Sequence, residues 1–203
     1  MNTNYTQSGS RTEAVAAAIK ERRSIKQFKA EPLPAGLLEE LLDIAVWAPN
    51  HGLREPWRFI AFTGEGTGFL ADAAEKWIQK SSGNAEFAAK KRGYIAAIPA
   101  SVIVVMPEDP RQREWDEDFA AVSALIQNLQ LAAWERGVGT IWKTDPYIYA
   151  PAFRDAMGVK PGEKITALIH LGYAEKVPGS HPRTPSKDVT LVVDRYPEGD
   201  KLD

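Results

Sequence analysis

The sequence predicts one domain in which helices and strands alternate along the chain, of the α/β or α+β class. In several segments apolar residues recur every three or four positions, which is the spacing of amphipathic helices. Short β-branched runs such as residues 101–106 lie between them and are typical of buried strands. No internal repeat or clear linker divides the 203 residues, a length that suits one domain with a substantial core.

The expected helices follow from apolar spacing and from the residues that end each pattern. In chain order they are residues 11–22, 37–45, 68–80, a piece that ends near 94, 114–136 and 150–157. The helix 114–136 is the longest and is apolar around most of its circumference, through residues such as Leu125 and Leu129. Such a helix is usually buried on more than one side, so we expect it to be central and also to face a partner subunit.

The expected strands are residues 57–62, 101–106, 139–143 and 165–173, with a short additional strand at 189–193. Strands interspersed with helices define the fold class. Residues 1–10 are polar and are expected to be disordered. From residue 176 onward the chain is rich in proline and charge, and we expect an extended arm over 176–203.

Composition excludes several classes of function. With 25 basic and 27 acidic residues, the formal net charge is −2, and no global field points to nucleic acid or to an anionic membrane. The absence of cysteine excludes disulfides, thiolate metal sites and cysteine nucleophiles. Neither a signal peptide nor a membrane-spanning run is visible in the sequence. We expect a cytoplasmic protein that binds neither nucleic acid nor membrane.

Two segments near the start carry candidate binding residues. The first places Arg22, Arg23, Ser24 and Lys26 at the end of the first helix. Arginine offers a planar fork of donors and lysine a mobile charge, so this group suits a phosphate and a polyol chain. The alternative is a solvated basic helix end, favoured by the helix dipole. The second segment contains Pro49, Asn50 and His51 and leads into 55–59, Glu-Pro-Trp-Arg-Phe.

Two later groups add to the candidates. Trp142, Lys143 and Thr144 combine an aromatic ring, a cation and a hydroxyl at the C-terminal end of a strand, where ligand sites of α/β folds form. Core packing at the strand end is the alternative for the tryptophan. Arg183 lies in an extended Pro-Arg-Thr-Pro stretch, where it is either an exposed arginine or a second phosphate ligand.

Other chemistries leave no signature. The three histidines lack paired metal spacing, His170 reads as a core residue, and there is no G-x-S-x-G elbow. The glycine-rich turn after residue 63 fails the dinucleotide pattern because Phe69 occupies the last glycine position. The acidic run 116–118 reads as a first helical turn favoured by the dipole. We therefore expect no metal site and no catalytic side-chain nucleophile or base.

Taken in order, these segments resemble the nitroreductase family of FMN-dependent NAD(P)H oxidoreductases, in particular its short single-domain members. The matching segments are residues 22–28, 48–51, 56–59, 120–133, 137–144, 171–173 and 182–183, so the resemblance covers about residues 14–185. It implies an α+β sandwich with a mixed central sheet flanked by helices. It also implies a homodimer with two FMN molecules at the subunit interface.

The resemblance assigns a role to each candidate residue. Arg22, Arg23 and Ser24 would hold the FMN phosphate and ribityl chain, and Lys26 would approach the N1–O2 edge of the ring. The remaining candidates would reach the flavin from the other subunit (Pro49, Asn50 and His51), complete the pocket beside the ring (Trp142, Lys143 and Thr144) or return to the phosphate (Arg183).

The implied activity is hydride transfer from NADH or NADPH, through flavin N5, to an electron-poor small molecule such as a nitroaromatic or quinone, by a ping-pong mechanism. The flavin carries the chemistry, and Lys26 only tunes it. The alternatives are a protein that stores or senses FMN without significant turnover, and a flavin-fragmenting or dehalogenating family member. One departure stands out, because Glu55 replaces the glutamine that many relatives carry before Pro-Trp.

Overall fold

A four-stranded antiparallel sheet forms the centre of the computed structural model, which describes residues 9–194. The strands are β1 (Arg58–Thr63), β2 (Ala100–Pro107), β3 (Val138–Lys143) and β4 (Glu163–Tyr173). They lie in the order β1-β2-β4-β3, so that β1 and β3 are the two edges. The four expected strands of the central region are confirmed to within two residues at each end.

A short extended segment adds to the β3 edge. Ser24 forms an isolated parallel bridge with Thr140, and the backbone N–H of Ile25 donates to the Thr140 carbonyl at 2.9 Å. Phe28 forms an antiparallel bridge with Ala174 at the end of β4. The parallel component of the sheet is this single bridge. The first basic segment is therefore fixed to the sheet by its backbone.

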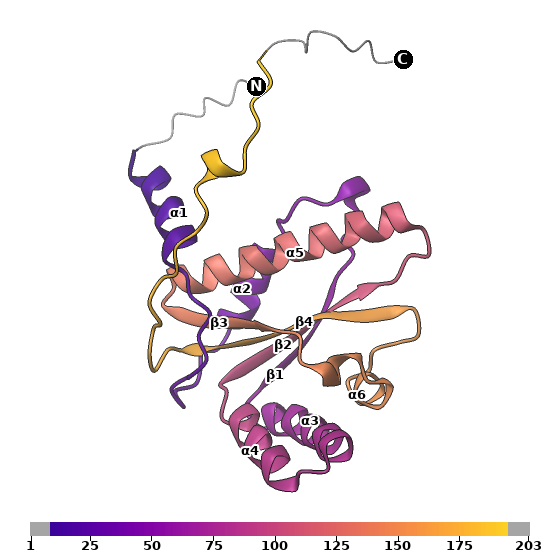
Figure 1. The fold of residues 1–203 in the computed structure, drawn as a ribbon. Helices are drawn as coiled ribbons and strands as arrows, with labels where there is room; N and C mark the ends of the chain where they lie inside the picture. Colours follow the sequence, from indigo (N-terminus) through magenta and orange to yellow (C-terminus); the bar gives the residue numbers. More distant parts are fainter. Residues whose placement is uncertain (1–8, 195–203) are drawn as a thin grey trace.

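Helices cover both faces of the sheet (Figure 1). One face carries α2 (Leu37–Ala45) and the long α5 (Gln112–Glu135), and α1 (Gly9–Glu21) contacts α5. The opposite face carries α3 (Gly66–Ser82), α4 (Ala85–Ala96), η2 (Pro146–Tyr149) and α6 (Pro151–Ala156). The result is the expected α+β sandwich. No helix in 9–194 is long and apolar enough to cross a membrane.

The central strand β2 shows why both faces need helices. Its residues from Ala100 to Met106 are buried. Val102 and Val104 point into the core beneath α5, whereas Ile103 and Val105 point into the core beneath α3. This division follows from the alternation of side chains along a strand.

The C-terminal arm differs from the expectation at one point. The short strand expected at 189–193 is wrong, since the described part of the arm, 176–194, contains only the 3₁₀ turn η3 (Ser186–Asp188). Its β-branched and apolar side chains are exposed, Leu191 to 87%. β propensity forms a strand only where a neighbouring strand offers a partner, and the described arm pairs with none.

Gly139 permits the docking of the basic segment on β3. A Cβ atom at this position would lie 2.5 Å from Cγ1 of Ile25, whose side chain is fully buried. Real Cβ atoms do not approach other atoms so closely. The absence of a side chain at Gly139 is therefore what lets the segment that holds Arg22 to Lys26 lie against the sheet edge.

We predict that Gly139→Ala lowers the free energy of unfolding by about 1–3 kcal/mol, the usual cost of overpacking. Gly93→Ala is the matched control, because Gly93 is inside α4 with open space around its missing Cβ, and it should stabilise by about 0.5–1 kcal/mol. Urea denaturation of both variants measures the difference. Equal free energies of unfolding for the two variants would show that the packing of Ile25 does not require a glycine at position 139.

Candidate functional site

Three arginines from two distant parts of the chain gather near the β3 edge. Arg22 and Arg23 follow α1, and Arg183 approaches from the C-terminal arm closely enough to influence Arg22 electrostatically. Burial lowers the pKa of Arg22, and the neighbouring charges of Arg23 and Arg183 lower it further. Arg23 is half-buried and its Nη1 donates to the Lys20 and Arg22 carbonyls. The three cations repel one another, so the cluster is suited to a multiply charged anion.

Arg22 has unsatisfied hydrogen-bonding capacity. Its Nε and Nη1 are buried, and nothing within the described residues accepts a hydrogen bond from either. Buried donors without partners are uncommon, because each costs free energy. A phosphate group would satisfy one of these donors with a charge-assisted bond. The observed arrangement therefore fits the phosphate that the sequence predicted for Arg22, Arg23 and Ser24.

Trp142 lies on β3, two residues beyond Thr140. Its ring packs against the core on the α5 side of the sheet, and its Nε1 is buried without a partner in the region that the structure describes. The same face holds a buried hydrogen bond from Gln130 of α5 to Thr140 Oγ1, at 3.3 Å. An aromatic ring with a free donor beside a cation cluster can pack against a planar polar ligand.

Strand alternation separates Lys143 from Trp142. Lys143 faces the α3–α4 side, where its Nζ lies 3.4 Å from Asp145 Oδ1, and Thr144 is exposed at the strand end. The side chains of Trp142 and Lys143 therefore lie on opposite faces of the sheet. Only the backbone of Lys143 lies next to Trp142, and a role for residues 143 and 144 beside a flavin ring stays a prediction.

Lys26 is exposed and lies beyond the Ser24 bridge, along the same segment. It lines a shallow hollow together with Tyr94 and Ala97 from the end of α4. No ion pair engages its ammonium group within the described residues. The ammonium group can therefore turn toward a ligand held by the arginine cluster.

The second predicted segment forms a tight, unusual loop before β1. Gly52, Leu53 and Glu55 adopt positive φ values of 63°, 51° and 46°. For residues other than glycine this left-handed conformation is uncommon and costs free energy. The side chain of Asn50 holds the loop, because its Oδ1 accepts the Glu55 N–H at 3.0 Å. Pro49 and His51 are exposed, so the loop presents these two residues to the outside.

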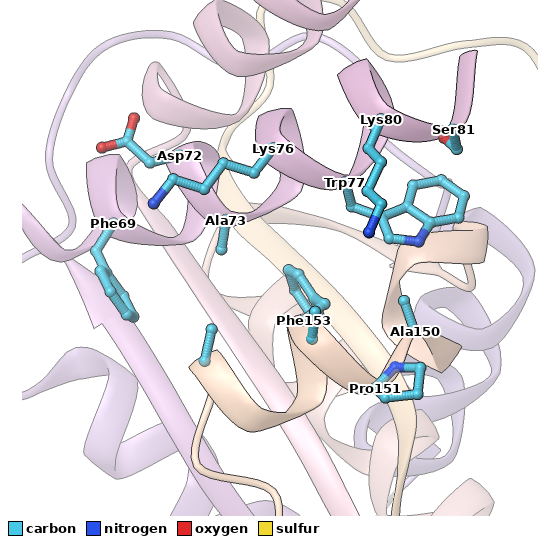
Figure 2. Close-up of a pocket in the computed structure, with 12 residues that line it drawn as sticks. Phe69, Asp72, Ala73, Lys76, Trp77, Lys80, Ser81, Ala150, Pro151 and Phe153 are labelled. Atoms are coloured by element: carbon cyan, nitrogen blue, oxygen red, sulfur yellow. The ribbon is translucent and has the colours of Figure 1, made fainter. Parts of the chain in front are cut away.

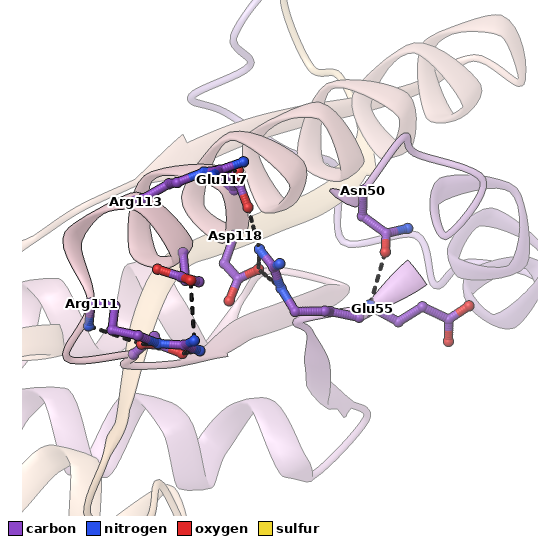
Figure 3. A network of polar contacts seen from close by, with 9 residues as sticks. Asn50, Glu55, Arg111, Arg113, Glu117 and Asp118 are labelled. Carbon is purple, nitrogen blue, oxygen red and sulfur yellow. Dashed lines mark hydrogen bonds and ion pairs between the residues drawn. The ribbon is translucent and has the colours of Figure 1, made fainter. Parts of the chain in front are cut away.

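Arg54 anchors this loop to α5 through Glu117 and Asp118. Figure 3 shows these two carboxylates on α5, and Asn50 bonded to Glu55 in the loop. Nε of Arg54 donates to Asp118 Oδ1 at 2.9 Å, and its Nη2 donates to Glu117 Oε2 at 3.0 Å. The Arg54 hydrogen bond is the largest cause that lowers the pKa of Glu117. Asp118 is only 5% exposed, so its charge depends on Arg54 for compensation.

Sequence reasoning missed this anchor. It read the acidic run 116–118 only as a first helical turn that the dipole favours, yet Glu117 and Asp118 bind Arg54. A usable signal was present. Asp118 falls in helical register with Val122 and Leu125, on the stripe of α5 that faces the sheet, and a carboxylate on an apolar stripe requires a partner.

The two predicted segments lie toward opposite edges of the sheet within one chain. The basic segment and Trp142 belong to β3, whereas the 49–51 loop leads into β1 (Figure 1). Within the described residues of one chain, Asn50 bonds to Ala48 and Glu55, and no hydrogen bond joins it to the arginine cluster. None of the described residues form a group of three or more side chains that could hold a metal ion.

We predict that Arg54→Met loosens the loop, because it removes both bonds to α5 and leaves Asp118 without its cation. The backbone amide of Glu55, bonded to Asn50, should exchange with deuterium faster than in the wild type. Arg113→Met is the matched control, since Arg113 is exposed and bonds Glu117 within its own helix. Equal exchange at Glu55 in both variants would contradict the anchoring role.

Comparisons with known proteins agree with this architecture. A family model described as the nitroreductase family matches residues 19–173. YfhC of Bacillus subtilis (strain 168), assigned by its name to the NAD(P)H nitroreductases, is 39% identical over 173 residues, which cover 84% of this chain and 89% of that protein. A crystal structure of a nitroreductase-like family protein from Bacillus cereus has a TM-score of 0.82 at 37% identity, covering 96% of this chain and 100% of that one.

A more distant structure shares the fold. The FMN-dependent nitroreductase NfnB from Mycobacterium smegmatis, solved in complex with NADPH, has a TM-score of 0.72 at 17% identity, covering 90% of this chain and 99% of that one. The family match extends from the end of α1 to the end of β4, and so includes the basic segment, the 49–55 loop and Trp142. The chain belongs to the nitroreductase family.

Proposed function

We propose that this protein is an FMN-dependent oxidoreductase that takes electrons from NADH or NADPH and passes them to an electron-poor small molecule, such as a nitroaromatic or a quinone. The observation that carries the proposal is the buried, unpartnered pair of Arg22 donors within a cluster of three arginines. Family membership adds the cofactor class, because NfnB of this fold is named as FMN-dependent. We also infer a single domain and a cytoplasmic location for the chain.

The chain's own residues would bind and orient the cofactor. Arg22, Arg23 and Arg183 would neutralise the phosphate, with Ser24 donating to it or to the ribityl hydroxyls. Trp142 would support the ring, and Lys26 would place a positive charge at the N1–O2 edge. When bound, FMN supplies hydride transfer at N5, which requires no side-chain nucleophile. A fixed cation at the edge where negative charge develops favours the reduced cofactor.

The direct test is the visible spectrum of the purified protein. We expect a yellow protein whose absorbance near the flavin maximum bleaches when NADH or NADPH is added without oxygen, and returns when a quinone is added. A yellow protein that does not bleach would support the rival function of FMN storage or sensing. A colourless protein that does not take up FMN would contradict both functions.

Arg22→Ala should lower FMN affinity by about ten- to a hundredfold, since a charge-assisted hydrogen bond is worth roughly 1.5–3 kcal/mol. The fold should survive, because Nε and Nη1 of Arg22 donate to no described residue. Arg92→Ala is the control, as Arg92 pairs with Asp72 between α4 and α3. Fluorescence titration with FMN measures both affinities. Equal retention of FMN would refute the assignment of Arg22.

Lys26→Met tests the electronic role. Removing the cation should lower the two-electron potential of bound FMN by about 30 mV or more, equivalent to about 1.4 kcal/mol, and should slow reduction by NAD(P)H. Lys29→Met is the control, because Lys29 is exposed three residues further along the same segment. Potentials are measured by equilibration with reference dyes. An unchanged potential in Lys26→Met would place Lys26 away from the ring.

We further propose that the protein is a homodimer in which the 49–51 loop of one chain completes the flavin site of the other. What supports the proposal is that the two sets of site residues belong to opposite sheet edges, so a second copy would join them. The surface between α1, α2 and the loop is apolar and exposed, with Trp47 at 86% and Leu53 at 82%. A hollow of about 480 Å³ lies among α1, α2 and α5 beside Trp47. Patches of this kind mark interaction sites.

The apolar residues of α5 from which the sequence predicted a partner-facing surface do not lie on the surface. Leu125 and Leu129 are fully buried within one chain, in the core between α5 and the sheet. A charge at either position would disrupt the fold rather than a dimer. The exposed apolar residues lie instead on α1, at the end of α2 and on η1 (His51–Leu53), as Val15, Ile19, Ile44, Trp47 and Leu53.

Trp47→Glu should therefore convert the dimer to a monomer and reduce FMN binding, because it places a charge in the centre of the apolar surface. Tyr149→Glu is the control, since Tyr149 is a 58% exposed aromatic residue on η2, on the other face of the sheet. Light scattering measures the mass. A wild-type monomer of about 22 kDa that holds one FMN per chain would rule out the shared site.

A further inference from the structure

A cavity of about 280 Å³ lies on the sheet face opposite α5, between α3, α4 and the ends of β3 and β4. It is not formed by any residue of the arginine cluster. Its walls are aromatic, with Trp77, Phe87, Tyr94 and Tyr147 contributing rings. A dry apolar cavity of about 150 Å³ accommodates benzene, so this one has room for a single aromatic ring with a polar substituent.

His170 of β4 supplies an unsatisfied polar atom in the cavity wall. The residue is 1% exposed, and its Nδ1 lies 2.8 Å from Ser101 Oγ. Its Nε2 is buried and has no hydrogen-bond partner within the described residues. Sequence reasoning expected a satisfied core histidine, and only half of the imidazole fits that description. An unpaired imidazole nitrogen in a cavity wall calls for a ligand.

Ser101 determines which ring nitrogen of His170 carries the hydrogen. The Ser101 hydroxyl is fully buried, and Nδ1 of His170 is its one hydrogen-bond partner among residues 9–194. A buried hydroxyl hydrogen needs an acceptor, so Oγ–H donates to Nδ1. The proton of the neutral ring is then on Nε2, a buried donor of a residue that lines the cavity. Burial lowers the pKa of His170 to about 3, which keeps the ring neutral at physiological pH.

The charges around the cavity are unequal. Lys91 and Lys143 line it, and Asp145 is the carboxylate opposite them. Asp145 is already engaged, with Oδ1 beside Lys143 at 3.4 Å and Oδ2 accepting from the Tyr147 hydroxyl at 3.3 Å. Lys91 lies over the Phe87 ring, at 5.7 Å from its centroid, without a carboxylate partner in the described region. The lining therefore has one positive charge in excess.

The tyrosine hydroxyls remain donors. Burial raises the pKa of Tyr94, with the charge of Asp145 adding to the effect, and burial likewise raises the pKa of Tyr147. The ring of Tyr94 meets the His170 ring edge to face, with centroids 6.2 Å apart. Donors, aromatic walls and one uncompensated cation together match a planar ring that carries an anionic acceptor.

We propose that this cavity binds a monocyclic aromatic carboxylate, with the carboxylate accepting from His170 Nε2 and facing Lys91, and the ring between the aromatic walls. This site contains none of the arginine cluster, although Tyr94 also lines the hollow beside Lys26, and it stands whether or not the flavin chemistry is confirmed. It is also distinct from the larger hollow between α3 and α6 (Figure 2), although Trp77 and Ser81 line both. That hollow contains no buried unpartnered donor of the described residues.

A bound carboxylate would also act on the end of β3. Lys143 and Asp145 belong to the cavity wall, and Trp142 and Thr144 are their neighbours in the chain. Occupation would hold residues 143–147 in place and so limit the movement of the strand end that carries Trp142. A ligand in the cavity would therefore affect Trp142, on the opposite face of the sheet, without contacting it.

The probe is benzoate, titrated into the full-length protein labelled with ¹⁵N, with the side-chain Nε2–H signal of His170 as the readout. We expect a saturable shift with a Kd in the millimolar range or below. Benzamide, which keeps the ring without the charge, and cyclohexanecarboxylate, which keeps the charge without the aromatic ring, should each bind more weakly. The flavin spectrum is recorded in parallel, since it reports binding over the ring of FMN.

Lys91→Met tests recognition of the charge. It should weaken benzoate by about fivefold, the scale of a partly exposed ion pair. Lys90→Met is the matched control, because Lys90 is the exposed neighbour on α4 and does not line the cavity. It should bind benzoate as the wild type does. Neither residue belongs to the proposed flavin site.

Three results would overturn the proposal. The first is the absence of a saturable His170 shift up to about 10 mM benzoate, tenfold above a millimolar Kd. The second is a change in the flavin spectrum while the His170 signal stays fixed, which would place benzoate on the flavin instead. The third is equal benzoate affinity in Lys91→Met and Lys90→Met, which would remove the basis for carboxylate recognition.

Discussion

The contact between Ile25 and the bare backbone of Gly139 is the constraint on which the candidate site depends. Ile25 is fully buried, and no side chain at Gly139 could coexist with it at the observed distance of 2.5 Å from the missing Cβ. The contact fixes a segment that has a single bridge, Ser24 to Thr140, to hold it to β3. Arg22, Ser24 and Lys26 flank Ile25 in sequence, so the contact that fixes Ile25 also fixes the backbone of these three residues. A hydrophobic contact thus orients a polar site.

The sheet then divides the molecule into two chemically different halves. Toward α5, the core of one chain is continuous and apolar, apart from the Gln130–Thr140 pair and the anchored carboxylate of Asp118. Toward α3 and α4, the packing leaves a cavity lined by tyrosine, histidine and lysine. Residues adjacent in sequence, Trp142 and Lys143, belong to different halves because β3 is a strand. Because of this alternation, a shift of β3 would move side chains on both faces of the sheet together.

Much of the fold could be predicted from the sequence, because it rests on local patterns. The spacing of apolar residues identified α2 and α5, and the β-branched run 101–106 identified β2, within a few residues. The expected strand at 189–193 failed for a non-local reason, since strand formation needs a free edge that its composition cannot supply. The positive φ values of Leu53 and Glu55 were not predictable for a similar reason, since the residue between them, Arg54, bonds to α5, which is distant in sequence.

The candidate site was predictable only in part. The charge and spacing of residues 22–26 identified a phosphate-binding type of segment, and the structure adds the buried, unpartnered donors of Arg22. Lys143 was grouped with Trp142 because the two are neighbours in sequence, and only the strand shows that their side chains diverge. The His170 cavity was missed because its four aromatic walls come from α3, α4 and η2. Such convergence is a property of the tertiary structure and leaves no pattern within any one element.

The division of candidate residues between the two sheet edges bears directly on assembly. If one chain formed a complete site, the loop 49–51 would have to reach the β3 edge, yet Arg54 fixes that loop to the first half of α5 at 2.9 Å from Asp118. The anchor is partly buried, so a loop that crossed the sheet would have to break the bonds of Arg54 to Glu117 and Asp118. The proposed two-fold related copy would remove the conflict, because the loop of one chain would meet the arginines of the other with no change in either. The exposed Trp47 and Leu53 lie on the same side as that loop. Residues 47–53 therefore carry both kinds of side chain. The proposed partner would cover the apolar Trp47 and Leu53, and the ligand of the partner would contact the polar Asn50 and His51.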